Sequence, residues 1–162
     1  MDGAPKISVA VCTYNRAELL RGALQSLVEQ SLDKALYEVL VVDNASTDHT
    51  SDVVRLFQCA NPELEIILVS EARQGLGYAR NTGFNNSKGA YVAFMDDDTR
   101  SDKNWLKLAL DCFEHVRPTP WSVGGPVFPF YDSPKPAWFK DEYETDTWGD
   151  TPRFLKDRKS VV

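Results

Sequence analysis

The stretch Tyr91-Val92-Ala93-Phe94-Met95-Asp96-Asp97-Asp98 is a short apolar run that ends in three acidic residues. Apolar runs of this length, rich in β-forming residues, predict a buried strand. Two carboxylates about 5 Å apart at the strand tip repel by roughly 3 kcal/mol at an effective dielectric of about 20. A cation would relieve that repulsion, and hard oxygen ligands such as Asp98 suit Mg²⁺ or Mn²⁺, which in turn hold phosphates. The alternative interpretation is a solvated turn, because Asp is common in turns.

The residues around this stretch alternate between strand and helix patterns. The expected strands are 7–12, 37–42, 64–69, 90–95 and 122–128, and the expected helices are 16–30, 48–58, 77–85 and 102–116. Such alternation, with continuously apolar strands, predicts an α/β, Rossmann-like fold whose mostly parallel sheet carries helices on both faces. Asn15 and Glu18 resemble a capping box at the start of the first helix, and Ser46 and Thr47 are candidate caps for the second.

The composition changes along the chain and suggests two regions. Residues 1–130 carry the strand and helix patterns, whereas 131–162 form a Pro- and Trp-rich acidic tail without a regular period. A length of 162 residues fits one domain plus such a tail. Two interpretations of the tail stay open: it wraps the core, or it begins an acceptor-binding region that needs more chain.

Charge and cysteine content narrow the function classes. A net charge of −6 argues against nucleic acid as the main partner. Cys12, Cys59 and Cys112 are odd in number and lack metal-ligand spacing, so packing roles and a reducing compartment fit them. The first residues lack an apolar signal segment, and no run reaches the roughly 20 apolar residues of a membrane span. These features predict a cytoplasmic protein, with peripheral attachment to the inner face of a membrane left open.

Polar clusters follow three of the expected strands. In parallel sheets, ligands bind beyond the carboxyl ends of the strands, so clusters 13–16, 43–46 and 96–98 should converge on one edge. Thr13 and Asn15 are able to bond a base or sugar edge, and Tyr14 is able to stack on a base. The carboxylate of Asp43 is suited to a base N–H or a ribose hydroxyl. Helix capping for Asn15 and turn formation for Asp43 are the structural alternatives.

The segment Gln74–Gly83 is the other informative stretch, because its glycines permit close backbone approach. Arg80 within it is a candidate clamp for a diphosphate, since guanidinium groups pair well with phosphate oxygens. The alternative is an ordinary surface arginine. The glycine spacing is not the dinucleotide-binding fingerprint, which should follow the first strand.

Taken together, four stretches resemble the family-two glycosyltransferases of the GT-A fold. They are 9–16, 41–48, 75–83 and 96–98, and their order and spacing match that family across about residues 6–128. The resemblance implies an enzyme that transfers a sugar from a nucleotide-diphosphate sugar, most often a UDP-sugar, to a glycan or other hydroxyl acceptor, usually with inversion. The implied nucleotide-sugar-binding residues are Thr13, Tyr14, Asn15, Asp43, Ser46, Arg80, Asp96 and Asp97. Asp98, at the end of the D-x-D motif, is the implied ligand of Mg²⁺ or Mn²⁺.

The sequence departs from the family at the catalytic base, for which no counterpart is identified. Asp141, Glu142, Glu144 and Asp146 lie in the right general region, but a solvated acidic stretch is the favoured interpretation of them. A donor-binding module that lacks the base is therefore an alternative function. A phospho-accepting receiver would need acids where Thr13-Tyr14-Asn15 stand, and a nucleotidyltransferase would need a Gly- and Arg-rich loop there.

Overall fold

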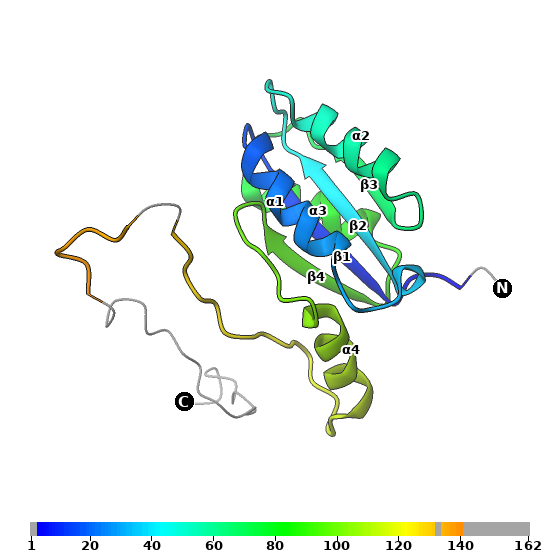
Figure 1. The fold of residues 1–162 in the computed structure, drawn as a ribbon. Helices are drawn as coiled ribbons and strands as arrows, with labels where there is room; N and C mark the ends of the chain where they lie inside the picture. Colours follow the sequence, from blue (N-terminus) through cyan, green and yellow to red (C-terminus); the bar gives the residue numbers. More distant parts are fainter. Residues whose placement is uncertain (1–2, 132–133, 141–162) are drawn as a thin grey trace, which may run out of the picture. The chain divides into compact units, whose positions relative to one another are not determined.

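Four parallel strands form one sheet in the computed structural model, which describes residues 3–131 and 134–140. They are β1 (Ile7–Thr13), β2 (Tyr37–Asp43), β3 (Glu65–Ser70) and β4 (Tyr91–Asp96), in the order β3-β2-β1-β4 (Figure 1). The register pairs Cys12 with Asp96 and Thr13 with Asp43. Because these pairs lie at the strand ends, the polar residues that follow β1, β2 and β4 emerge at one edge.

Helices cover both faces of the sheet, which confirms the expected α/β architecture. Helices α1 (Ala17–Val28) and α2 (Thr50–Ala60) lie on one face and α3 (Leu76–Asn86) on the other (Figure 1). The α1 and α2 face holds the main core, where Val9 and Val41 pack with Leu20. Helix α4 (Trp105–His115) joins the same core through Leu106 and Leu110, and a short 3₁₀ turn, Lys34–Leu36, precedes β2.

On the opposite face, α3 packs directly against the strands at a glycine. A Cβ added at Gly83 would lie 3.0 Å from Ala10 Cβ and 3.3 Å from Val42 Cγ2. The absence of a side chain at Gly83 therefore lets the helix backbone approach the sheet closely. This contact places the start of α3, which contains Arg80, beside the carboxyl ends of the strands.

The caps of α1 and α2 differ from those expected, because one carboxylate in the loop just before α2 serves both helices. Helix α1 begins at Ala17 and α2 at Thr50, and neither N-cap residue makes a side-chain capping bond. Instead, Asp48 Oδ2 accepts a hydrogen bond from Ala17 N at 3.1 Å, and its Oδ1 accepts one from Thr50 N at 3.0 Å. One carboxylate thus caps two helices. The expected Asn15–Glu18 capping box is wrong, because Glu18 pairs with His49 at 2.9 Å.

The strand expected at 122–128 is also absent from the described residues, which form no strand between 121 and 131. A strand needs a ladder partner, and here Gly124, Gly125 and Pro126 weaken the segment because glycine lacks a side chain and proline lacks a donor. This segment belongs to the second of two compact units, Met1–Pro120 and Trp121–Val162.

Within the described part of the second unit, aromatic residues contact one another. The rings of Tyr131 and Phe139 meet edge-to-face with their centroids 6.0 Å apart, and those of Trp138 and Phe139 with their centroids 5.7 Å apart.

Among the residues that the structure describes, no helix combines the length and apolar character needed to cross a membrane.

Candidate functional site

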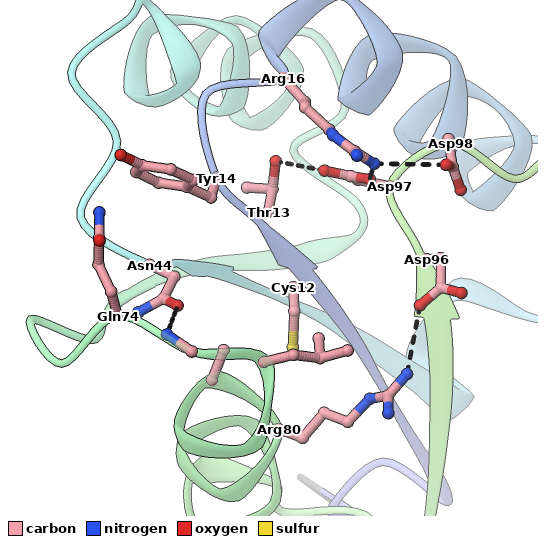
Figure 2. Close-up of a pocket in the computed structure, with 13 residues that line it drawn as sticks. Cys12, Thr13, Tyr14, Arg16, Asn44, Gln74, Arg80, Asp96, Asp97 and Asp98 are labelled. Atoms are coloured by element: carbon pink, nitrogen blue, oxygen red, sulfur yellow. Dashed lines mark hydrogen bonds and ion pairs between the residues drawn. The ribbon is translucent and has the colours of Figure 1, made fainter.

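A cleft of about 520 Å³ opens at the carboxyl edge of the sheet (Figure 2). Ligand pockets in proteins typically have volumes of this order. Its walls come from the ends of β1 and β4, the residue after β2, and the start of α3 with its preceding loop. The lining residues are Cys12, Thr13, Tyr14, Arg16, Asn44, Gln74, Gly75, Leu76, Ala79, Arg80, Asp96, Asp97 and Asp98.

The three acidic residues at the tip of β4 have different environments. The side chain of Asp97 is only 7% exposed, and that of Asp98 is 50% exposed. Thr13 Oγ1 donates a 2.8 Å hydrogen bond to Asp97 Oδ2, and Arg16 Nη1 lies 3.3 Å from Asp97 Oδ1. Asp97 is therefore an internal anchor between β1 and β4, whereas Asp96 and Asp98 face the cleft and solvent.

Two guanidinium groups offset the acidic charge. Arg16 Nη1 lies 3.3 Å from Asp98 Oδ2, and Arg80 Nη2 lies 3.5 Å from Asp96 Oδ1 (Figure 2). Arg16 comes from the start of α1 and Arg80 from the second turn of α3, so two different elements bring positive charge to the cleft. The rim therefore offers both carboxylate oxygens and guanidinium donors to a ligand.

The loop before α3 is held in place by Asn44. Its Nδ2 donates to the backbone oxygens of Glu71 at 2.9 Å and Arg73 at 2.7 Å, and its Oδ1 accepts from Gly75 N at 2.8 Å. Gly75 has a φ of +138°, which favours glycine at this position. These bonds fix the loop so that Gln74 and Gly75 form one wall of the cleft.

The Glu71 carboxylate is a second anchor of the same loop. The Glu71 carboxylate accepts hydrogen bonds from Arg73 N at 2.8 Å, Arg73 Nε at 3.1 Å and Thr82 Oγ1 at 2.6 Å. The bonds from Arg73 and Thr82 lower the pKa of Glu71 to about 2. The Arg73 guanidinium also lies over the Tyr78 ring at 4.6 Å. Loop and helix are thereby joined in one polar network.

The thiol of Cys12 lies at the base of the cleft (Figure 2). Burial raises its pKa above the ordinary value of 9.0; the Arg80 guanidinium opposes this shift, and the carboxylates of Asp96 and Asp97 add to it. A thiol in this state is protonated at neutral pH and is a poor nucleophile. Cys12 therefore serves as a small packing group, whereas Cys59 is exposed, contrary to the packing role expected for it.

Three of the sequence-predicted residues do not line the cleft. They are Asn15, Asp43 and Ser46, and hydrogen bonds link them to one another. Asn15 N donates to Ser46 Oγ at 3.0 Å, and Ser46 N donates to Asp43 Oδ1 at 2.9 Å. Asn15 Oδ1 also accepts from Thr47 N at 2.7 Å. These contacts join the loops after β1 and β2 beside the cleft. A direct contact of the three residues with a nucleotide stays a prediction.

Among the lining residues to which the sequence assigns no binding role, two make the side-chain hydrogen bonds described above. Arg16 and Asn44 directly follow residues that had been assigned one, and Arg16 is the cation in the polar cluster after the first strand. Their position next to those residues is the signal in the sequence that points to the cleft. Their partners, 81 residues and 31 residues away along the chain, were not visible in the sequence.

The carboxylates considered for a catalytic base lie outside the described residues. These are Asp141, Glu142, Glu144 and Asp146.

Comparison with known proteins identifies the family of the chain. The sequence model described as glycosyl transferase family 2 matches residues 8–158. Glycosyltransferase AglE of Haloferax volcanii is 43% identical over 103 residues, covering 64% of this chain and 34% of that protein. The chain belongs to glycosyltransferase family 2.

Solved structures share the same sheet and helices. The mannosyltransferase PcManGT of Pyrobaculum calidifontis, in complex with GDP-Man and Mn²⁺, matches with a TM-score of 0.62 and 35% identity, covering 67% of this chain and 32% of that chain. TarS of S. aureus in complex with UDP-GlcNAc matches with a TM-score of 0.63 and 32% identity, covering 67% and 31%. The fold is that of the GT-A glycosyltransferases, and the chain spans about a third of the length of these proteins.

Proposed function

We propose that this chain binds a nucleotide-diphosphate sugar in the cleft and carries the donor side of a sugar transfer to an acceptor hydroxyl. The observation that carries this proposal is the convergence of Tyr14, two arginines and the β4 acids on one cleft at the carboxyl edge of the sheet. Relatives of the same fold bind donors of this class, GDP-Man in PcManGT and UDP-GlcNAc in TarS. A UDP-sugar is the donor that we expect here.

The side chains of the cleft suggest how the donor would be held. Tyr14 is exposed and offers an aromatic face on which the base is able to stack. Arg80, which lies opposite Asp96, offers a planar fork of donors to the diphosphate. Asp96 then accepts hydrogen bonds from ribose or sugar hydroxyls. Gln74 and Gly75, held by Asn44, close the base end of the cleft.

A divalent cation, Mg²⁺ or Mn²⁺, fits the chemistry of these donors. Mg²⁺ sites commonly use one or two carboxylates completed by phosphate oxygens and water, and Asp98, with Asp96 beside it, supplies hard oxygen atoms on the solvent side. No group of three or more His, Cys, Asp or Glu side chains placed to hold a metal occurs among residues 3–131 and 134–140, so the diphosphate would have to complete the site. When bound, the cation neutralises charge on the departing diphosphate.

The proposed reaction is a single displacement with inversion. The acceptor oxygen forms a bond to the anomeric carbon as the bond from that carbon to the diphosphate oxygen breaks, and the diphosphate leaves with the electron pair. Arg80 stabilises the negative charge that grows on it. The acceptor proton passes to a carboxylate base. We propose that residues 131–162 belong to the acceptor side, with Asp141, Glu142, Glu144 and Asp146 as candidates for this base.

Calorimetric titration of UDP, GDP and dTDP, each with Mn²⁺ and with EDTA, tests the donor site. We expect one nucleotide to bind, with Mn²⁺ required, and the Arg80→Gln variant to bind it more weakly. Arg55→Gln is the matched control, because Arg55 pairs with Asp52 on α2 outside the cleft. Binding of no nucleotide would contradict the proposal. Donor that binds but is never consumed, with acceptor or water, would instead indicate a binding module without the base.

A further inference from the structure

Arg16 lies between two acidic residues of the cleft. It is the residue before α1, and its Nη1 atom lies 3.3 Å from Asp97 Oδ1 and 3.3 Å from Asp98 Oδ2. One guanidinium therefore bridges two neighbouring carboxylates. Figure 2 shows it reaching from the α1 side across to both acids.

The two carboxylates hold Arg16 unequally. Asp97 is buried and is also fixed by Thr13, so this end of the bridge is part of the internal packing. Asp98 is half exposed, and Arg16 is the ion-pair partner that the described part of the chain provides for it. Exposed ion pairs are weak and exchange readily with solvent ions. The Asp98 end is thus the one that opens.

We infer that Arg16 is the resident counter-ion of Asp98, and that a divalent cation has to displace it from this carboxylate while Arg16 stays on Asp97. This inference rests on the metal dependence proposed above. A cation bound to Asp98 would stand beside the guanidinium, and like charges at that distance repel. Arg16 therefore weakens metal binding in the absence of the donor.

When the donor is present, the displaced guanidinium has a new binding partner. Once released from Asp98, Arg16 remains at the rim with free donors, and an anionic diphosphate in the cleft would pair with them. The cost of separating Arg16 from Asp98 is then recovered only when metal and diphosphate bind together. Arg16 thereby couples the two ligands, so that neither is held strongly alone.

Titration with Mn²⁺ alone, followed by electron paramagnetic resonance of the free ion, tests the inference. The samples are the full chain, Arg16→Gln, Arg16→Lys and the control Arg55→Gln, which removes the same charge from a pair outside the cleft. We expect Arg16→Gln to bind Mn²⁺ about two- to fivefold more tightly, the size set by loss of one exposed ion pair. Arg16→Lys should fall between it and the parent, and Arg55→Gln should match the parent.

The outcomes separate this inference from the proposed function. If the parent binds Mn²⁺ and Arg16→Gln binds it no more tightly, or if Arg55→Gln tightens binding equally, the counter-ion role is wrong and the donor site stands. If no sample binds Mn²⁺, including Arg16→Gln, the counter-ion inference fails, and the metal dependence of donor binding is then decided by the nucleotide titrations with Mn²⁺ and with EDTA. A second readout is the Arg16 Nε–H resonance, which should shift when Mg²⁺ is added to the parent. It should not respond to Mg²⁺ in Asp98→Asn, and a parent resonance that ignores Mg²⁺ would also overturn the inference.

Discussion

Asn44 Oδ1 accepts a hydrogen bond of 2.8 Å from the backbone N–H of Gly75, 31 residues further along the chain. The same amide donates to the backbone oxygens of Glu71 and Arg73. A single buried side chain at the tip of β2 therefore sets the conformation of the loop that forms one wall of the cleft. The shape of the cleft depends on this contact.

Replacement of Asn44 by Ala should loosen that wall. Three backbone groups would lose their partner, and a buried unsatisfied group costs about 1–3 kcal/mol. We expect weaker nucleotide binding together with a lower free energy of unfolding, measured by calorimetry and urea denaturation. Asn61→Ala is the control, because Asn61 bonds Phe57 O at the end of α2. Equal losses of nucleotide binding in both variants would contradict the role of Asn44.

Asp97→Asn should mainly lower the stability of the fold, whereas Asp98→Asn should mainly abolish metal-dependent nucleotide binding. Asp97→Asn removes the charge of a buried carboxylate that accepts from Thr13 and pairs with Arg16, so it should lower stability by about 1–3 kcal/mol. Asp98→Asn removes an exposed pair, so stability should change by at most about 1 kcal/mol while metal-dependent nucleotide binding is lost. Urea denaturation and calorimetry with Mn²⁺ measure the two effects. Undiminished binding by Asp98→Asn would refute its assignment as the metal ligand.

The Glu71 network should make stability depend on pH. Its folded pKa of about 2 lies below the ordinary value of 4.5, so the carboxylate stabilises the fold above the ordinary pKa. That contribution is lost as the pH falls from 4.5 towards 2. Glu71→Gln should therefore be less stable than the parent at neutral pH, with the difference shrinking across this window. Urea midpoints at a series of pH values test this, and a constant difference would contradict it.

Gly83→Val should push α3 away from the sheet. The added atoms would meet Ala10 and Val42, and overpacking of this kind costs about 1–3 kcal/mol. Gly77→Val is the matched control in the same helix, because a Cβ there meets nothing within 4 Å. We expect a lower melting temperature for Gly83→Val alone. Since Arg80 lies on α3, nucleotide binding should weaken in parallel.

Local patterns were sufficient for most of the fold. The apolar runs that end at Thr13, Asp43 and Asp96 predicted β1, β2 and β4 to within one residue. The two inner strands, β1 and β2, are buried as expected of apolar strands covered on both faces, whereas β4 is an edge strand and is mostly half-buried, contrary to the buried strand expected there. Helix starts were predicted less well. Asp48 caps α2, which begins two residues later, and also caps α1, and no local pattern near α1 marks a cap that comes from 31 residues away.

The expected strand at 122–128 shows where a local sequence pattern fails to predict structure. Its apolar residues fit a strand, but a strand forms only where a neighbour completes its hydrogen bonds, and the described residues provide none for it. A pattern therefore predicts that a segment is compatible with a sheet, not that a partner is present.

The sequence by itself determined the class of fold, the edge of the sheet at which the site lies, and the residues Thr13, Tyr14, Arg80 and Asp96–Asp98 that line it. It did so because strand periodicity and the parallel connections bring the strand ends to one edge. Only the tertiary structure decided which charges pair there. Arg16 joins Asp97 and Asp98, and Asn44 holds Gly75, because contacts between residues far apart in the chain depend on the packing of whole elements.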